Sequence, residues 1–510
     1  MRGFTYQELI FGDTLGEKNS FEAVIIKSQQ GGIRLARVSL ENVSNILRTD
    51  SYKITQPLMY PQDLVTVYAY GEPRGGLYPA VTYVGGQPLF MNYLMNPVTM
   101  DDIDYAEQLF NEHFMGVELF DRAGWEIIVK EYQGYMPVRI WTADEGLTIP
   151  TRNVFYAIEN TDKRVPWAGQ HVEGLLMKHV WNSSDVATTS RECKKIILRY
   201  LIKNGTPEII SSRLQSFGYR GVSSEESAGL GELGHLANFE GTDTIIGIEA
   251  VRRFYGATKM PGYSVFAAEH ANVMMYRTEE EFFRAVVALA KKLKAPFYSV
   301  VSDTRNIYEA CEKIWGEALK AEVIDCPGIL VVRPDSGVPH EVVRQCVEIL
   351  DKKFGHTKNI KGYKVLNHVR IIQGDGIDAD EIERILEALD IRGWSADNIV
   401  FGMGGALLQK HDRDTQKWAM KGAEYTYADG EVRDVKKTPV TDSGKFSKSG
   451  RQKLVFTEDG FETYHIKDTC PRAQLPQQLK MRYENGYLYN LTNWNSVVEN
   501  AKVDTPAGRF

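Results

Sequence analysis

Between about residues 190 and 415, short apolar runs alternate with amphipathic segments. Each apolar run ends in glycine or charged residues: FGYRG (217–221), ANFEGTD (237–243), GYSVFAAEH (262–270), FYSVVSD (297–303), GILVVRPDSG (328–337), VRIIQGDG (369–376) and NIVFGMGG (398–405). Helical spacing of apolar residues marks the segments between them: 279–293, 307–319, 340–354 and 379–389. Repeated strand, loop and helix units predict parallel strands, and seven of them favour a barrel over an open sheet.

The flanking regions have a mixed pattern. A strand is predicted at TVYAYG (66–71) and a helix at 100–114, and strand-like pieces return at KLVFTED (453–459) and YLYNLTNW (487–494). The basic loop SGKFSKSGRQK (443–453) is interpreted as a solvated turn. We therefore expect three parts: an extension of open role (1–48), a barrel domain (186–414), and a second α+β domain built from 49–185 and 415–510.

Three aspartates stand at the ends of predicted barrel strands. In such a barrel the loops after the strands converge on one mouth, where catalytic residues cluster. Asp303, Asp335 and Asp375 would therefore be neighbours. Carboxylates suit Mg²⁺, which usually sits between one or two of them and substrate phosphates. The alternative is that each aspartate simply caps a helix.

Two glycine-rich stretches have different contexts. GLGELG (229–234) has the spacing of a dinucleotide-binding loop, but the polar stretch GVSSEESA precedes it instead of a strand, which excludes that function. Ser223 and Glu226 predict a capping box that opens a helix there.

GMGG (402–405) follows the apolar run NIVF, so its backbone N–H groups could approach a phosphate, with Arg413 and Lys421 adding charge. A plain turn is the alternative. Asp375, in IIQGDGID (371–378), lies at the same rim, where its carboxylate could bind ribose hydroxyls.

His270, Arg333 and Asp335 also follow predicted strands. His270 could be a base, a ligand or a nucleophile, although a lone histidine is more often a satisfied polar residue. Arg333 and Asp335 could seal a strand end as an ion pair or face an anionic, polar ligand.

Composition narrows the class of protein. The 510 residues include 60 Lys and Arg against 67 Asp and Glu, a formal charge of −7, which argues against a general nucleic-acid binder. Five widely spaced cysteines suggest neither a disulfide framework nor a zinc site. The N-terminus lacks the apolar core of a signal peptide, and no run reaches the ~18 apolar residues of a membrane helix. We expect a soluble, cytoplasmic protein with no membrane contact.

Taken together, several motifs resemble the nicotinamide phosphoribosyltransferases, a group of type II phosphoribosyltransferases. These motifs are TDSYK (49–53), FGYRGVSS (217–224), NFEGTDT (238–244), PGYSVFAAEH (261–270), VVSD (300–303), ACEKIWGE (310–317), RPDSG (333–337), QGDGID (373–378) and FGMGGALLQK (401–410). The resemblance runs from about residue 49 to 460. It implies that nicotinamide and phosphoribosyl pyrophosphate give nicotinamide mononucleotide and pyrophosphate, with Mg²⁺, in NAD salvage. It also implies a homodimer with active sites at the subunit interface.

The resemblance assigns the base-binding residues. Phe217 and, from the partner subunit, Tyr52 would sandwich the pyridine ring, since aromatic rings stack on a flat heteroaromatic. Asp243 would accept a hydrogen bond from the carboxamide and would repel the carboxylate of nicotinic acid.

The resemblance also implies the catalytic and phosphate-binding residues. Arg333 would reach the carboxamide and the phosphate side, and Asp335 would face the ribose and the developing positive charge. Arg220 and Mg²⁺ would hold pyrophosphate. The remaining substrate-binding residues are Asp303, Gly374 and Asp375 (the last two at the ribose), Gly404, Gly405 and Arg413 (5′-phosphate), and, less directly, Arg74, Lys421 and Lys437 (phosphates).

His270 matches a histidine that the family phosphorylates, which couples ATP hydrolysis to product formation. Two alternatives stay open at this point. The same fold could act on nicotinic acid, or the chain could be a binding protein that keeps the fold without the activity.

Overall fold

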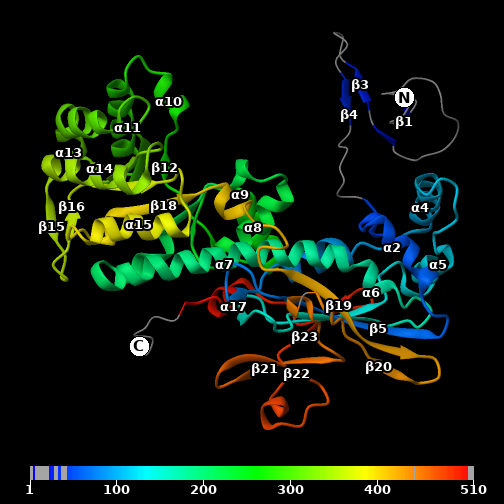
Figure 1. Cartoon of the computed structure of the whole chain (residues 1–510). Helices are drawn as coiled ribbons and strands as arrows, with labels where there is room; N and C mark the ends of the chain where they lie inside the picture. The colour runs from blue at the N-terminus through cyan, green and yellow to red at the C-terminus, as the bar shows by residue number, and fades with distance from the viewer. Residues whose placement is uncertain are drawn as a thin grey trace.

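The computed structural model describes residues 43–441 and 443–503, together with the backbone of four short strands before residue 43. These strands form two antiparallel pairs, β1 (Phe4–Thr5) with β2 (Glu22–Ala23) and β3 (Ile25–Lys27) with β4 (Ile33–Leu35). Most of the extension expected at 1–48 therefore lies outside the described residues. The rest of the chain forms two domains that share one long helix, α7 (Glu173–Asn204) (Figure 1).

The first domain is built around a parallel sheet. Its seven strands, in spatial order, are β11 (Gly241–Thr242), β10 (Leu214–Ser216), β18 (Ile399–Met403), β17 (Val369–Gln373), β14 (Ile329–Arg333), β13 (Phe297–Val301) and β12 (Phe266–Ala267). A parallel bridge joins Gly241 to Tyr263, just before β12, and so links the two edges of the sheet. The expected α/β barrel and all seven of its strands are confirmed.

Helices follow the strands and cover the sheet. They are α8 (Glu225–Leu236), α9 (Ile245–Tyr255), α10 (His270–Met274), α11 (Glu279–Leu293), α12 (Ile307–Glu309), the π-helix η7 (Ala310–Ala318), α13 (Lys320–Asp325), α14 (Pro339–Phe354), α15 (Ala379–Asp390) and α16 (Gly405–Leu408). Shorter pieces are η5 (Pro207–Ser212), η6 (Tyr219–Gly221), η8 (Ala396–Asn398) and the hairpin β15 (His356–Lys358) with β16 (Lys364–Leu366). The four predicted helices are confirmed, the second as α12 continued by η7.

Helix α11 shows why these predictions succeed. Thr278 caps its N-terminus by accepting the Glu281 N–H, acids fill its first turn and lysines its last, which suits the helix dipole. Its buried residues recur at helical spacing: Phe282, Phe283, Val286, Val287 and Ala290.

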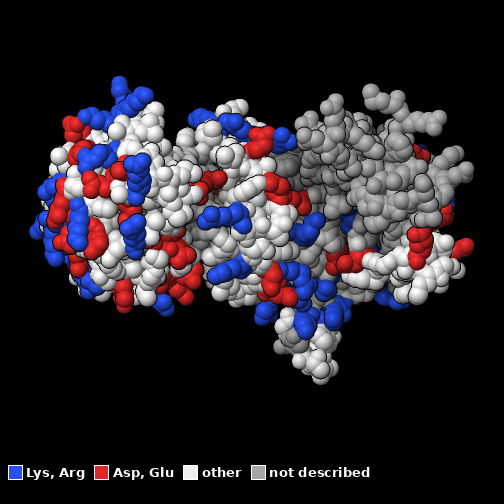
Figure 2. All heavy atoms as spheres, turned by 90° about the horizontal axis from the view of Figure 1, so that it is seen from above, with Lys and Arg blue, Asp and Glu red and all other residues white. Residues whose placement is uncertain are grey.

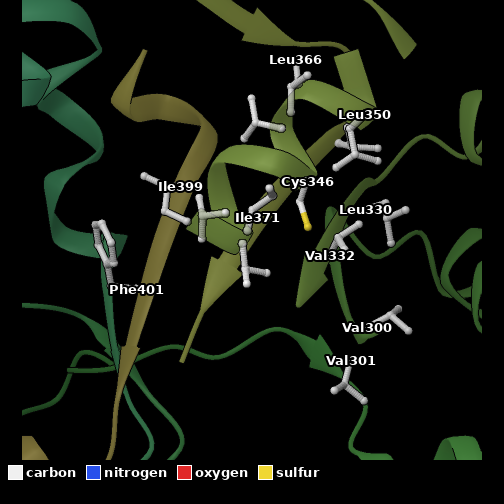
Figure 3. Packing of buried hydrophobic residues seen from close by; sticks show 14 of the residues in the cluster. Val300, Val301, Leu330, Val332, Cys346, Leu350, Leu366, Ile371, Ile399 and Phe401 are labelled. Atoms are coloured by element: carbon white, nitrogen blue, oxygen red, sulfur yellow. The ribbon is translucent and has the colours of Figure 1, made fainter. Parts of the chain in front are cut away.

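The barrel core lies between strands and helices. Figure 3 shows Leu330 and Val332 of β14 beside Cys346 and Leu350 of α14. All four side chains are fully buried, at 0% exposure. Each buried aliphatic side chain of this size contributes roughly 1.5–3 kcal/mol of transfer free energy, so the strands hold their register and their ends stay fixed.

The second domain is built around an antiparallel sheet. Its order is β20 (Val432–Asp434), β19 (Trp418–Tyr427), β5 (Leu64–Pro73), β9 (Tyr156–Asn160), β7 (Val138–Thr142), β23 (Lys480–Glu484) and β24 (Tyr487–Leu488). Two small antiparallel sheets accompany it: β6 (Ala80–Thr82) with β8 (Thr148–Pro150), and the hairpin of β21 (Gln452–Thr457) with β22 (Gly460–His465). Its other elements are η2 (Asn45–Leu47), α2 (Ser51–Thr55), η3 (Gln56–Met59), α3 (Gly86–Leu89), the π-helix η4 (Phe90–Leu94), α4 (Met100–His113), α5 (Arg122–Tyr132), α6 (Ala168–His171), η9 (Ser443–Lys445), η10 (Pro471–Gln474) and α17 (Trp494–Asn500).

The GLGELG stretch lies inside α8, where it packs against α7 and α9. A β-carbon on Gly234 would lie 2.4 Å from the carbonyl oxygen of Ser183 in α7. The helix is confirmed, but the predicted cap is wrong by one residue. Ser224, not Ser223, caps it by accepting the Ser227 N–H at 3.1 Å.

One further local prediction is wrong, and one helix was not predicted. YLYNLTNW is strand only at Tyr487–Leu488, and Asn493 then caps α17. The long helix α7 is not predicted by the sequence pattern at all.

Lys, Arg, Asp and Glu side chains are interspersed over the barrel domain, at the left of Figure 2. Within residues 43–441 and 443–503, no helix combines the length and apolar character needed to cross a bilayer.

Candidate active site

The ends of β13 and β14 are locked side by side. Val301 pairs with Arg333 in the parallel register, and the Ser302 N–H donates to the Arg333 carbonyl at 3.0 Å. Asp303 lies two residues after the end of β13, and Asp335 lies two residues after the end of β14. The two carboxylates thus belong to one mouth, as the barrel predicts.

His270 begins α10 and meets the carboxylate of Asp303. Its Nε2 lies 2.8 Å from Asp303 Oδ1, and its Nδ1 lies 4.0 Å from Asp335 Oδ2. The imidazole is 40% exposed, whereas the Asp303 side chain is 5% exposed. A buried acid therefore orients a ring whose other nitrogen faces the second acid.

Asp303 is held in its ionised form. Its Oδ2 accepts hydrogen bonds from the Ser336 hydroxyl at 2.6 Å and from the Asp335 N–H at 3.1 Å. Burial works to raise the pKa of Asp303. The hydrogen bonds from Ser336, His270 and the main chain of residue 335 outweigh burial, and the pKa lies below its ordinary value.

Arg333 and Asp335 form a direct ion pair. The guanidinium donates to Asp335 at 2.9, 3.0 and 3.1 Å, and the two side chains are 20% and 17% exposed. A planar fork on a carboxylate fixes the direction of both groups.

Phe217 lies where that guanidinium can face its ring. The Arg333 carbon Cζ is 5.5 Å from the ring centroid. On its other sides the ring touches backbone, because β-carbons on Gly402 and Gly374 would lie 2.1 and 3.1 Å from it. Glycine at these strand ends makes room for a flat ring, and a second ring could stack on it.

Asp243 follows β11 and is exposed. Its N–H donates to the Ser216 carbonyl at 2.9 Å, and its carboxylate accepts a hydrogen bond from Ser264. Asp243 is thus tied to the residue that precedes Phe217, which brings the two predicted base-binding residues to neighbouring strand ends.

The glycines after β18 approach the loop that carries Arg220. Gly404 is the N-cap residue of the four-residue helix α16, which starts at Gly405. A β-carbon on Gly221 would lie 3.1 Å from Gly405, so the two loops touch. Arg220 itself is exposed in η6, and Asp375 is exposed after β17.

Four of the predicted cations gather in or next to the second domain. Burial lowers the pKa of Lys421; Glu173 opposes this, and Arg74, Lys437 and Arg413 lower the pKa further. Each of these three cations therefore lies near enough to Lys421 to act on it, as an anion site requires.

Tyr52 is a predicted base-binding residue that does not contact Phe217 within the single chain. It is 57% exposed on α2, with the Lys53 ammonium 5.6 Å from its ring centroid. Among the described residues no ring contact joins it to Phe217. The role of Tyr52 at another subunit's site stays a prediction.

No group of three or more His, Cys, Asp or Glu side chains in the described part of the chain is placed to hold a metal ion. A Mg²⁺ carried mainly by substrate phosphates needs only one or two carboxylates. Asp335 and Asp375 follow the neighbouring strands β14 and β17 and fit that need.

A cavity of about 760 Å³ lies elsewhere, between α8 and α9 on one side and the second domain on the other. Its lining includes Arg48, Tyr93, Lys178 and Glu226, and none of the predicted site residues.

Sequence reasoning missed the partners that hold the site. Ser264 binds Asp243, and Ser336 binds Asp303. Ser336 stands inside the RPDSG motif and could have been noticed, whereas nothing in the sequence links Ser264 to residue 243.

Comparisons with known proteins agree with this geometry. The family model described as "Nicotinate phosphoribosyltransferase (NAPRTase) family" matches residues 212–486, and "Nicotinamide phosphoribosyltransferase, N-terminal domain" matches residues 44–140. A nicotinamide phosphoribosyltransferase of Xanthomonas campestris is 44% identical over 414 residues, covering 80% of this chain and 87% of that protein. One of Acinetobacter baylyi is 28% identical over 478 residues, covering 86% and 93%.

Two solved structures share the fold. The crystal structure of nicotinate-nucleotide pyrophosphorylase from Pyrococcus furiosus has a TM-score of 0.58 at 15% identity, covering 92% of this chain and 97% of that one. Human nicotinic acid phosphoribosyltransferase has a TM-score of 0.51 at 14% identity, covering 89% and 92%. The resemblance stated from the motifs is confirmed, and the chain belongs to the nicotinate phosphoribosyltransferase family, with the relatives named nicotinamide phosphoribosyltransferase.

Proposed function

We propose that this chain transfers the phosphoribosyl group of phosphoribosyl pyrophosphate to nicotinamide, giving nicotinamide mononucleotide and pyrophosphate in NAD salvage. The observation that carries the proposal is the position of Arg333. Its guanidinium is clamped by Asp335 and faces the Phe217 ring at 5.5 Å, so one side chain adjoins both an aromatic platform and the catalytic carboxylates. The relatives named nicotinamide phosphoribosyltransferase support the choice of substrate.

The reaction needs no oxidant or proton transfer. The lone pair of the pyridine nitrogen forms the new bond to the ribose carbon C1′, while the bond from C1′ to pyrophosphate breaks and its electron pair leaves with pyrophosphate. Positive charge develops on the ribose as this happens. The carboxylate of Asp335 is placed to stabilise that charge, and Phe217 fixes the plane of the attacking ring.

Phosphate groups would be held from both domains. Gly404, Gly405 and Arg220 lie at the barrel mouth for this role, and Mg²⁺ bound beside Asp335 and Asp375 would neutralise charge on the leaving pyrophosphate. The cluster of Arg74, Arg413, Lys421 and Lys437 would bind further phosphates.

Base choice rests on Asp243. Its carboxylate can accept a hydrogen bond from the carboxamide of nicotinamide, whereas the carboxylate of nicotinic acid would face a like charge. Nicotinic acid remains the second candidate substrate, because human nicotinic acid phosphoribosyltransferase shares the fold.

His270 would couple ATP to the reaction. Its Nε2 is engaged by Asp303, so Nδ1 is the nitrogen available to attack a γ-phosphate, giving phosphohistidine and ADP. Later hydrolysis of the phosphohistidine returns the free imidazole and inorganic phosphate.

We also propose a homodimer in which Tyr52 of one subunit completes the base site of the other. The exposed position of Tyr52, away from Phe217 of its own chain, supports this arrangement. A cytoplasmic setting fits the five cysteines, which are all free thiols.

The test is a base competition assay on wild type and Asp243→Asn. We expect wild type to form mononucleotide from nicotinamide far better than from nicotinic acid, and the variant to lose roughly tenfold of this preference. Ser264→Ala, which removes only the partner of Asp243, is the matched control and should keep most of the preference. Equal discrimination by wild type and Asp243→Asn would refute the assignment of Asp243.

A further inference from the structure

A second acidic side chain lies beneath the proposed base site. Glu232, on α8, is 0% exposed, and its Oε2 accepts a hydrogen bond from the Ser216 hydroxyl at 2.6 Å. Its other oxygen, Oε1, makes no well-aligned hydrogen bond among the described residues, although the Thr242 and Thr244 hydroxyls face the carboxyl group. Burying a carboxyl group without full pairing is costly, so its presence here needs an explanation beyond stability.

Glu232 joins the two strand ends that carry the base-binding residues. Ser216 is the last residue of β10, directly before Phe217, and it pairs with Thr242 of β11, directly before Asp243. The Ser216 carbonyl also accepts the Asp243 N–H at 2.9 Å. One serine thus connects Glu232 to both Phe217 and Asp243.

The negative charge of Glu232 also interacts with Asp243. Asp243 is the charged neighbour that acts on it electrostatically. A charge at 0% exposure is screened less by water than an exposed one, so it acts over a longer range. Two carboxylates beside the proposed base site make that site unfavourable for an anionic base.

We propose that Glu232 is a positioning and specificity residue, which holds Ser216 between Phe217 and Asp243 and adds a buried negative charge that disfavours nicotinic acid relative to neutral nicotinamide. This inference rests on the proposed function and deepens it, because it names a second determinant of base choice.

The carboxyl group of Glu232 changes its charge near neutral pH. Burial raises its pKa to about 7, against the effect of the Ser216, Thr242 and Thr244 hydroxyls. The groups that face it are these hydroxyls, Asp243, and on α9 the backbone of Gly247, whose added β-carbon would lie 2.2 Å from Glu232.

The nearby His235 on α8 stays neutral from about pH 6 to 8, because burial lowers its pKa to about 4. Base selectivity should therefore rise with pH as Glu232 ionises, while nicotinic acid stays an anion throughout this range.

The experiment measures kcat/KM for nicotinamide and for nicotinic acid, at about pH 6, 7 and 8, on the full-length protein. We expect the ratio of the two values to rise several-fold with pH in wild type. In Glu232→Gln, which keeps shape and hydrogen bonding but has no charge, the ratio should be lower by on the order of tenfold at pH 8 and independent of pH.

Asp185→Asn is the control, because Asp185 is equally buried but its partner is Trp418, away from the strand ends. It should keep the wild-type ratio and its pH dependence. A merely structural role for Glu232 would lower both kcat/KM values together and leave their ratio unchanged.

The outcomes separate the two proposals. If the wild-type protein forms mononucleotide from neither nicotinamide nor nicotinic acid, the proposed function is refuted. An active wild type whose ratio does not change with pH and matches that of Glu232→Gln would refute the role of Glu232 alone. If Glu232→Gln does not fold, the pH dependence of the ratio in wild type decides.

Discussion

Asp303 links two functional groups that the sequence separates by more than sixty residues. It binds His270 through one oxygen and the loop of Asp335 through the other. Any change in its charge should therefore alter the histidine and Asp335, the proposed catalytic carboxylate, together, even though the Asp303 side chain is almost fully buried.

This gives a prediction on ATP coupling. His270→Ala should abolish stimulation by ATP and leave some turnover without ATP. Asp303→Asn should also lose stimulation and, because hydrogen bonds to charged groups contribute about 1.5–3 kcal/mol, should lower basal kcat roughly tenfold or more. Mononucleotide formation with and without ATP measures both effects.

His340→Ala is a suitable control. This histidine, at the start of α14, pairs with Glu381 of α15 and not with Asp303. It should keep stimulation. Persistence of ATP stimulation in His270→Ala would contradict the coupling role.

At the scale of single residues, the sequence predicted the acidic residues of the site but not the side chains that hydrogen-bond to them. Asp303, Asp335 and His270 stand at strand ends, which the alternation of apolar runs reveals. Ser264 and Glu232 meet their partners only through the packing of separate units, and Glu232 looked like one residue of a glycine-rich helix.

At the scale of the elements, α7 and α8 approach each other closely at one glycine. The backbone of α7 approaches Gly234 so closely that a methyl group would lie 2.4 Å from the Ser183 oxygen and 2.6 Å from the Ala187 nitrogen. This close approach explains the glycine at 234 without any nucleotide, whereas added β-carbons on Gly229 and Gly231 would make only ordinary contacts.

Gly234→Ala should therefore push α8 from α7 and destabilise the protein by about 1–3 kcal/mol. Gly174→Ala, in the first turn of α7, is the matched control, because nothing lies within 4 Å of its added β-carbon. It should stabilise the helix by about 0.5–1 kcal/mol. Thermal unfolding of the two variants measures the contrast, and equal melting temperatures would contradict it.

The barrel elements could be predicted because each has a one-sided apolar pattern. Helix α7 could not, because it passes between two domains and is buried on several faces. Polar residues such as Ser184, Thr188 and Ser190 are buried there, so neither periodicity nor propensity marks a helix.

Across the whole molecule, buried histidines set an acid limit on stability. Burial lowers the pKa of His171 to about 4, of His179 to about 3 and of His235 to about 4. Below about pH 6.5 the unfolded chain binds protons that the native state refuses, so stability falls by roughly 1.4 kcal/mol per histidine per pH unit.

Glu232 acts in the opposite sense. Its pKa is raised from 4.5 to about 7, so the native state holds this proton more tightly than the unfolded chain, and stability is lost as pH rises through 7. We expect the melting temperature to be highest between about pH 6 and 7 and to fall steeply below. His179→Gln should make the acid slope shallower, and an unchanged slope would contradict the assignment.

The dimer is tested by mixing inactive variants. If Tyr52 completes the partner's site, a mixed dimer of Tyr52→Ala and Arg333→Ala has one site with both defects and one with none. Co-refolded mixtures should then recover up to about a quarter of wild-type activity. If Tyr52 served its own chain, every site would carry a defect and nothing would be recovered.

The barrel is inserted into the second domain, between β9 and β19, and this fixes an order of events during synthesis. When the barrel emerges from the ribosome, β5 and β7 each still lack a neighbour, because β19 and β23 come later. The growing chain thus exposes two open sheet edges, one until β19 appears from Trp418 and the other until β23 appears from Lys480. A message cut short after the barrel would yield a chain whose second-domain sheet keeps both edges unpaired and is therefore prone to aggregate.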